Sequence, residues 1–447
     1  NAFKVKNISL IIVVFFSFSS LKAQQTLSAK DAVFKALANN YEMQVAHMQV
    51  DIADKNNSWG EAGLFPTVQL GVSFNNAIQD NRNNPFTFTP GVIMNQSLSP
   101  SLTANWNIFS GFLVRISKQR LELLEEQSKG NALSLIETTT QDVIKAYYSA
   151  QLQKERMKLY EKVMTISSKR KQLYTLKEKY AASSSLELMQ FNNQYLTDST
   201  NYLLQEISYN NSIRNLLLLM NEQDSTVTSS SLILTDSLNF DFPLLDKTEI
   251  INLMLSNNQN LKNQYLTIEL QKKQTELRKS FLYPTISLSA GASPNYSWLQ
   301  DLKNDEFQIQ TQTLQYYGNV NLRYTLFDNW KNQRSIQVSK IQETIASVST
   351  ESMRRTLVTT LENLIDIYQL RSNLLSISEE NLEYATKAWE LAQRRFELGS
   401  INSVDLATFQ NNYQNTLIQH YENLYNKLET YLEIYRMSGN LGLDFVE

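Results

Sequence analysis

Apolar and polar residues alternate along four short stretches of this chain. The first stretch places an apolar side chain at every second position: Val68, Leu70, Val72 and Phe74. A period of two indicates a strand with one apolar face, found both in half-buried soluble sheets and in outer-membrane barrels. The four predicted strands are about 64–76, 98–110, 284–293 and 316–328. Polar segments over 76–97 and 293–315 are expected to be loops.

A period of seven residues runs through the two segments that follow the strand pairs. In the first segment the apolar positions are Leu152, Leu159, Ile166, Leu173 and Tyr180. In the second they are Leu361, Tyr368, Leu375, Leu382, Trp389 and Phe396. A strict seven-residue repeat is typical of helices that supercoil around each other. We predict coiled-coil helices over about 112–221 and 330–437. A helix over 112–180 would be about 100 Å long, which favours a rod or a tube.

The two patterns recur because the chain is duplicated. Asn39, Pro66 and Phe109 return as Asn257, Pro284 and Phe327, each after the same step of 218 residues. The predicted units are a first repeat over 24–221, a linker over 222–246, a second repeat over 247–437 and a C-terminal tail over 438–447. Each repeat is expected to hold a helix, two strands, a long helix and a further helix.

Four strands are too few to seal a membrane barrel. The smallest single-chain barrels use eight strands, and an open sheet edge in lipid leaves unpaired backbone groups that cost several kcal/mol each. If the strands lie in a membrane, other copies must complete the sheet, and three copies would supply twelve strands.

The N-terminal residues 1–23 are typical of a secretory signal peptide. Lys4 and Lys6 precede an apolar run over 8–18, and small residues follow. This signal, together with aromatic strand ends and polar loops, favours the outer-membrane interpretation of the alternating stretches.

Composition argues against several kinds of chemistry. The chain has no cysteine and two histidines, which excludes a disulfide framework and a thiol nucleophile. Its formal net charge of −3 gives no basic field for nucleic acid. The common hydrolase and phosphate-binding motifs are absent from the sequence. We therefore expect no enzyme activity, no cofactor, no metal site and no nucleic-acid partner.

Three segments resemble the TolC-like outer-membrane efflux protein family: residues 32–40, 64–66 and 396–406. The resemblance extends over essentially the whole mature chain and implies a trimer. Its twelve-stranded outer-membrane barrel would continue into an α-helical barrel in the periplasm. Such proteins are passive exit ducts of tripartite efflux or type I secretion systems. The implied partners are outer-membrane lipid, a periplasmic adaptor (membrane fusion) protein and an inner-membrane pump or ABC transporter.

The resemblance also implies a constriction near the far end of the helices. The residues at the matching positions are Asp405, Thr408, Phe396, Glu187 and Gln190. A threefold ring of Asp405 would favour cations. Thr408 departs from the acidic pattern of the family, and Phe396 lacks the hydroxyl of the usual tyrosine. Asp405 also fits an ordinary role as a helix N-cap or first-turn acid.

The adaptor is expected to contact the tips of the coiled-coil helices. The corresponding residues are Gly399, Ser400, Ile401, Ser183 and Ser184. Ile401 replaces a basic residue of the family, and Gly399 is also the type of residue that terminates a helix.

An alternative function is a structural or adhesive coiled-coil protein of the cell envelope without a conduit. The feature that separates the two is the strand pair in each repeat, because an adhesive stalk would not need it.

Overall fold

The computed structural model describes residues 25–180, 185–222 and 232–441. The predicted signal peptide at 1–23, the tip residues Ser183 and Ser184 and most of the predicted tail lie outside the described residues.

The chain folds as two successive copies of one pattern. The first copy comprises β1 (Gln25–Leu27), α1 (Ala29–Asn39), α2 (Tyr41–Asn56), β2 (Thr67–Asp80), β3 (Val92–Ser110), α3 (Leu113–Lys179) and α4 (Ser185–Leu219). The second comprises β4 (Leu232–Leu234), α5 (Lys247–Asn257), α6 (Gln259–Ser280), β5 (Thr285–Asp301), β6 (Asn304–Arg323), α7 (Lys331–Glu397) and α8 (Ser403–Ser438). Helices α5 to α8 and strand β5 each begin 218 residues after their counterparts.

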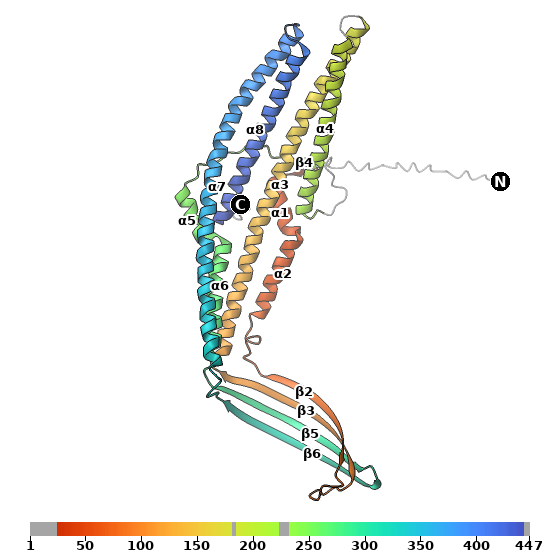
Figure 1. The fold of residues 1–447 in the computed structure, drawn as a ribbon, viewed down its shortest axis with the longest axis vertical. Coiled ribbons are helices and arrows are strands. Elements are labelled where there is room, and N and C mark those ends of the chain that lie inside the picture. Colours follow the sequence, from red (N-terminus) through yellow and green to blue (C-terminus); the bar gives the residue numbers. More distant parts are fainter. Residues whose placement is uncertain (1–24, 181–184, 223–231, 442–447) are drawn as a thin grey trace, which may run out of the picture.

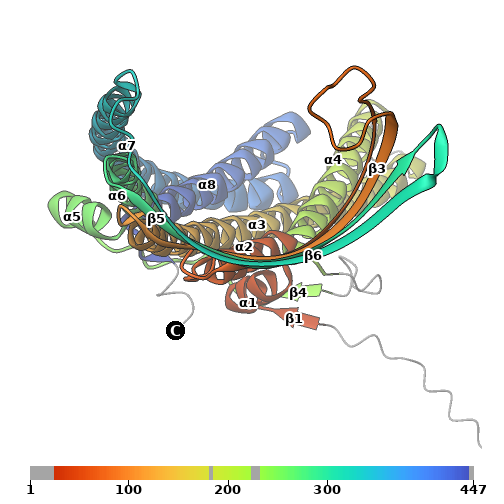
Figure 2. The same cartoon turned by 90° about the horizontal axis from the view of Figure 1, so that it is seen from below.

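The helices form an elongated array that stands on one sheet. Helices α7, α6, α3 and α2 lie side by side near the sheet, and the hairpins α3–α4 and α7–α8 extend away from it (Figure 1). Seen from below, sheet and helices follow a common arc (Figure 2). Within the described part of the chain, no helix combines the length and the apolar character needed to span a membrane.

The recurring Asn-Asn pair breaks the first helix of each copy in two. Asn40 has φ −62° and ψ 132°, and its side chain caps α2 by accepting a hydrogen bond from the Glu42 amide. The side-chain nitrogen (Nδ2) of Asn40 donates to the Leu219 carbonyl at 3.3 Å. In the second copy, the side-chain nitrogen of Asn258 donates to the Met437 carbonyl at 3.0 Å. Both donor and acceptor are repeated after 218 residues, so the duplication extends to side-chain contacts.

One antiparallel sheet joins the two copies in the order β2-β3-β5-β6. Its strands are longer than the alternating pattern predicted. The segment 293–315 that we expected to be a loop is almost entirely strand, and half of the expected loop 76–97 is strand. The backbone ladder continues there without an alternation of apolar and polar side chains, since Val92, Ile93 and Met94 are apolar in succession, so the period of two is not visible in the sequence. In contrast, β6 ends at Arg323, earlier than the predicted 328.

In each copy, two residues with positive φ redirect the chain where it leaves the sheet and enters the long helix. They are Gly111 and Phe112 (φ 64° and 67°) before α3, and Asn329 and Trp330 (φ 57° and 56°) before α7. The Phe112 ring packs edge-on against Phe109 and Tyr283, with centroids 5.4 and 5.8 Å away. These contacts offset the strain of the left-handed conformation.

The region predicted as a linker contributes to the core. Strand β4 pairs in parallel with β1, and Leu232 and Leu234 are buried. Beside this strand pair, the buried Tyr147 hydroxyl donates to the Leu27 carbonyl at 2.9 Å and accepts from the Asp236 amide at 3.1 Å. Residues 232–236 of the predicted linker thus pack on the first copy.

A buried carboxyl couples the stability of the helical part to pH. Glu137 on α3 is 9% exposed, and burial raises the pKa of its carboxyl to about 7, although Arg436 and Lys262 act in the opposite direction. The ordinary value is 4.5, so between 4.5 and 7 the folded protein binds more protons than the unfolded chain. Stability therefore falls as pH rises through this window.

We predict that Glu137→Gln stabilises the protein at about pH 8 by up to about 3 kcal/mol, and that the gain disappears at about pH 5. Thermal unfolding of the detergent-solubilised protein, followed by circular dichroism, measures the difference. Glu126→Gln, at an exposed position of the same helix, is the control. A gain of equal size at both pH values would contradict the assignment.

Candidate functional site

The turn between α7 and α8 is built by a glycine and an asparagine. Gly399 has φ 71°, a region that suits glycine, and the Ser400 amide donates back to the Arg395 carbonyl at 2.8 Å. Asn402 then caps α8, because its side-chain oxygen accepts from the amides of Val404 and Asp405 at 2.9 and 2.8 Å. The turn is therefore fixed at both helix ends.

A small core supports this turn. Leu406 is fully buried against Trp389 and Ala392, with Phe396 and Ile401 packed around them. The opposite hairpin brings Tyr174 from α3 and Phe191 from α4 together at a centroid distance of 4.2 Å. Phe396 lies 6.2 Å from Phe191, so the aromatic cluster spans both hairpins.

Arg170 on α3 makes the central polar contact between the hairpins. Its Nη1 donates to Gln410 Oε1 of α8 at 2.9 Å. Its guanidinium also lies over the rings of Trp389 and Phe396, at 5.5 and 6.0 Å from the centroids. Stacking and hydrogen bonding compensate a cation that burial disfavours, and burial lowers the pKa of Arg170.

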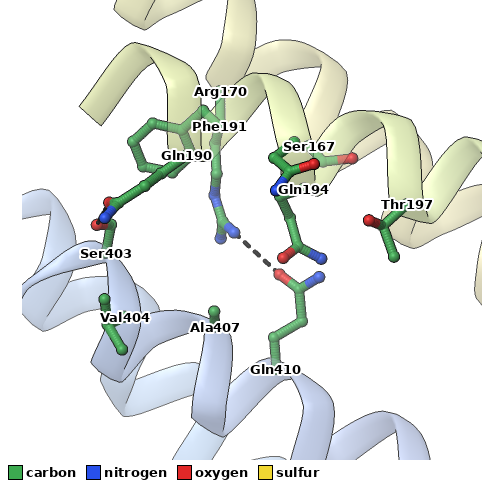
Figure 3. Close-up of a pocket in the computed structure, with 11 residues that line it drawn as sticks. Ser167, Arg170, Gln190, Phe191, Gln194, Thr197, Ser403, Val404, Ala407 and Gln410 are labelled. Carbon is green, nitrogen blue, oxygen red and sulfur yellow. Dashed lines mark hydrogen bonds between the residues drawn. The ribbon is translucent and has the colours of Figure 1, made fainter. Parts of the chain in front are cut away.

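A cavity of about 260 Å³ opens beside Arg170, between the α3–α4 hairpin and α8 (Figure 3). Most of its lining side chains are polar or small. At its outer end Ser403 Oγ donates to Gln190 Oε1 at 2.8 Å, a second bond between the hairpins. The cavity is thus bounded by two polar links near the helix tips.

Asp198 provides a buried carboxyl group behind this cavity. It is 3% exposed, and Gln194 donates to its Oδ1 at 2.9 Å. Burial raises the pKa of the Asp198 carboxyl, while Ser167, Gln194 and Arg170 partly offset that effect. The acid and Arg170 therefore stabilise each other's charged forms inside the junction.

The structure brings some of the predicted gate residues together. Gln190 and Phe396 both take part in the junction between the hairpins. Asp405 is exposed in the first turn of α8, and Thr408 is exposed with its hydroxyl bonded to the Val404 carbonyl at 3.0 Å. Glu187 lies in the first turn of α4, near Tyr174. The N-cap of α8 is Asn402, so Asp405 is a first-turn acid and is not itself the N-cap.

The predicted tip residues form the surface of the turn. Gly399 and Ser400 are exposed, whereas Ile401 is half buried in the core beneath.

Sequence analysis missed Arg170, Gln410 and Asp198. Arg170 and Gln410 are partners on different helices, 240 residues apart, and Asp198 also faces Ser167 and Arg170 of α3. One signal was present, because Arg170 lies between Ile166 and Leu173 on the face that carries the seven-residue repeat. A charge on that face indicates a buried partner.

Comparison with known proteins identifies a family that spans both copies. The family described as outer membrane efflux protein matches residues 32–222 and 250–440. No curated protein gives a significant match to the chain.

Solved structures show the same fold at low sequence identity. The CmeC outer membrane channel of Campylobacter jejuni has a TM-score of 0.72 and 12% identity, over 92% of this chain and 85% of that one. The outer membrane protein VceC of Vibrio cholerae has a TM-score of 0.69 and 11% identity, over 92% and 96%. The open state of the Neisseria gonorrhoeae MtrE outer membrane channel has a TM-score of 0.68 and 14% identity, over 92% and 89%.

We predict that Gly399→Ala loosens the tip of the α7–α8 hairpin by about 1–2 kcal/mol, because alanine is strained at positive φ. The added Cβ meets nothing within 4 Å, so the cost comes from the backbone alone. Amides over 400–406 should exchange hydrogen about 5- to 30-fold faster. Gly318→Ala is the control, since its site is equally open and its φ is ordinary. Equal exchange at the tip in both variants would refute the prediction.

Proposed function

The chain belongs to the outer membrane efflux protein family, and from this premise we propose that it forms the trimeric exit duct of a tripartite efflux or type I secretion system. As a member of that family it is an outer-membrane efflux protein, with its helical part in the periplasm. The trimer, the closed barrel and the partners are the proposed part.

The observation that carries the proposal is an open sheet with one apolar face. Cross-strand neighbours Leu70, Leu102, Ala292 and Tyr316 form one row across all four strands. The adjacent row, Gln69, Thr103, Gly291 and Tyr317, is more polar. Leu70 is 78% exposed and Tyr316 73% exposed. A sheet with an apolar face toward lipid and a polar face toward water is what a barrel wall requires.

The curvature of the sheet supports completion by further copies. Strands β2 and β6 are the two edges of the sheet within the residues that the structure describes. The sheet already bends along an arc (Figure 2), and three such arcs would supply the twelve strands of a closed barrel. The helical array follows the same arc, so closure of the sheet would also enclose a helical tunnel.

The partners follow from the passive nature of a duct. A periplasmic adaptor would contact the helix tips at Gly399, Ser400, Ile401, Ser183 and Ser184. An inner-membrane pump or ABC transporter would supply the energy. The alternative of an adhesive coiled-coil protein without a conduit is not favoured, since the family match covers both copies with their strands.

We further propose that the tips form the constriction, with three Asp405 carboxylates around the axis. The exposure of Asp405 and its place in the first turn of α8 support this. Thr408, Glu187, Gln190 and Phe396 would line the same region. A ring of three carboxylates attracts cations at close range.

Purified protein in planar lipid bilayers should give single-channel currents that prefer cations. Asp405→Asn should move the ratio of potassium to chloride permeability toward one and weaken block by multivalent cations, because three negative charges are removed from the ring. Asp51→Asn on α2, an exposed carboxyl far from the tips, is the control (Figure 1). Unchanged selectivity in Asp405→Asn would remove this residue from the gate, and a trimer without current would contradict the duct.

A further inference from the structure

The cavity beside Arg170 is large enough to hold a small molecule. Its volume is about 260 Å³, whereas roughly 150 Å³ is enough to hold a benzene ring inside a protein. Gln190, Asn193 and Thr197 line the cavity and are exposed, so a solute can enter from the solvent. The space therefore has room for one ring and one acidic group.

Arg170 gives this cavity a positive charge. Among the described residues that line it, Arg170 is the only one that carries a charge. Its guanidinium points into the space above Ala407 (Figure 3). Nη1 bonds to Gln410, whereas Nε and Nη2 have no hydrogen-bond partner within the part of the chain that the structure describes. Nε and Nη2 form one edge of the guanidinium, and such an edge matches the two oxygens of a carboxylate.

Gln410 adds a hydrogen-bond donor from the opposite wall. This residue is 2% exposed. Because Arg170 can only donate, the atom that faces it is Oε1, which leaves Nε2 for another acceptor. Across the residues described, Nε2 has no such acceptor. A buried donor without a partner is destabilising, and a ligand oxygen in the cavity would remove that cost.

The remaining wall suits a short apolar body. The ring of Phe191 lines the cavity from α4 and is 6% exposed, and Val404 and Ala407 line it from α8. The short side chain of Ala407 leaves the space beneath the guanidinium open (Figure 3). The cavity thus combines donors and a positive charge with a small apolar surface.

Asp198 does not occupy the proposed site. Its carboxyl group does not line the cavity, and its Oδ1 accepts from Gln194. Burial raises the pKa of this carboxyl, which favours its neutral form and reduces its competition with a ligand for Arg170.

We propose that this cavity binds a small organic anion, with a carboxylate on Arg170 and Gln410 and an apolar body against Phe191 and Ala407. Such a ligand contacts α3, α4 and α8 at once, so its binding stabilises the junction between the two hairpins. If the tips form the constriction, a ligand that ties the hairpins together reduces the current. Only this last consequence rests on the proposed function.

Hydrogen exchange of the whole, detergent-solubilised protein tests the site with benzoate as the probe. Benzoate combines one carboxylate with one ring, and benzamide has a similar shape without the charge. We expect a dissociation constant of about 1 mM for so small a probe. At about ten times that concentration, amides over 186–198 and 403–411 should exchange about tenfold more slowly, because opening of the junction releases the ligand. Benzamide should leave these amides unchanged.

Two variants alter the site in different ways. Arg170→Gln removes the charge and should weaken benzoate binding about 10- to 100-fold. Ala407→Leu keeps Arg170 but fills the space beneath its guanidinium, so it should abolish the protection. Lys169→Gln removes an exposed cation next to Arg170 that does not line the cavity. This matched control should bind benzoate as the parent protein does.

Currents in planar bilayers report the effect on the channel. Benzoate should lower the open probability of the parent protein and of Lys169→Gln, and should leave that of Ala407→Leu unchanged.

Protection by benzoate that is lost in Ala407→Leu, weakened in Arg170→Gln and kept in Lys169→Gln would support the proposal. Equal protection by benzamide, or full protection in Arg170→Gln, would overturn the recognition of an anion. No protection of the parent protein at about 20 mM benzoate would overturn the site and leave the proposed function standing. Protection without a change in current would overturn the effect on the channel. A parent protein without current would contradict the duct, while the exchange experiment still decides whether the site exists.

Discussion

The structure depends on the hydrogen bonds of a backbone that lies at a sheet edge. Strands β2 and β6 have one neighbouring strand each within the described residues, and the sheet carries an apolar face with exposures such as 78% at Leu70. In water, the backbone groups at the edge can form hydrogen bonds, but the apolar face stays exposed to water. In lipid, the apolar face is favourable, but the backbone groups at the edge stay unpaired. The proposed closure with further copies would satisfy both the edge and the face.

This constraint connects the duplication to the function. The positive-φ turns at Gly111 and Asn329 direct two long helices out of one sheet, so that sheet and helices share an arc. The proposed barrel, completed from such arcs, would continue as a hollow helical cylinder. Inside each chain the copies are joined by ion pairs such as Arg156 with Glu422 and by apolar contacts of Leu428 and Leu432 with the core around Tyr147. The tips carry the exposed Asp405 carboxylate of the proposed constriction, and the Arg170 junction holds the two hairpins together beneath them.

The sequence predicted the parts of the fold that have a period. Heptads located the long helices, and Val68 to Phe74 located the start of β2. The strand portions within 76–97 were missed because their side chains do not alternate: Val92, Ile93 and Met94 are apolar in succession, and polar residues follow them. The helix break at Asn40 and the strand β4 depend on contacts with distant residues, such as the Leu219 carbonyl and Leu27. Arg170 was missed for the same reason, since its partner Gln410 lies on another helix.

Hydrogen exchange at the two sheet edges tests the central claim most directly. For protein reconstituted in lipid bilayers, the account predicts that the outward-facing amides of β2 and β6 exchange as slowly as those of β3 and β5, because neighbouring copies accept their hydrogen bonds. Fast exchange along both edges, at the rate of exposed turns, would contradict a closed barrel made of several copies.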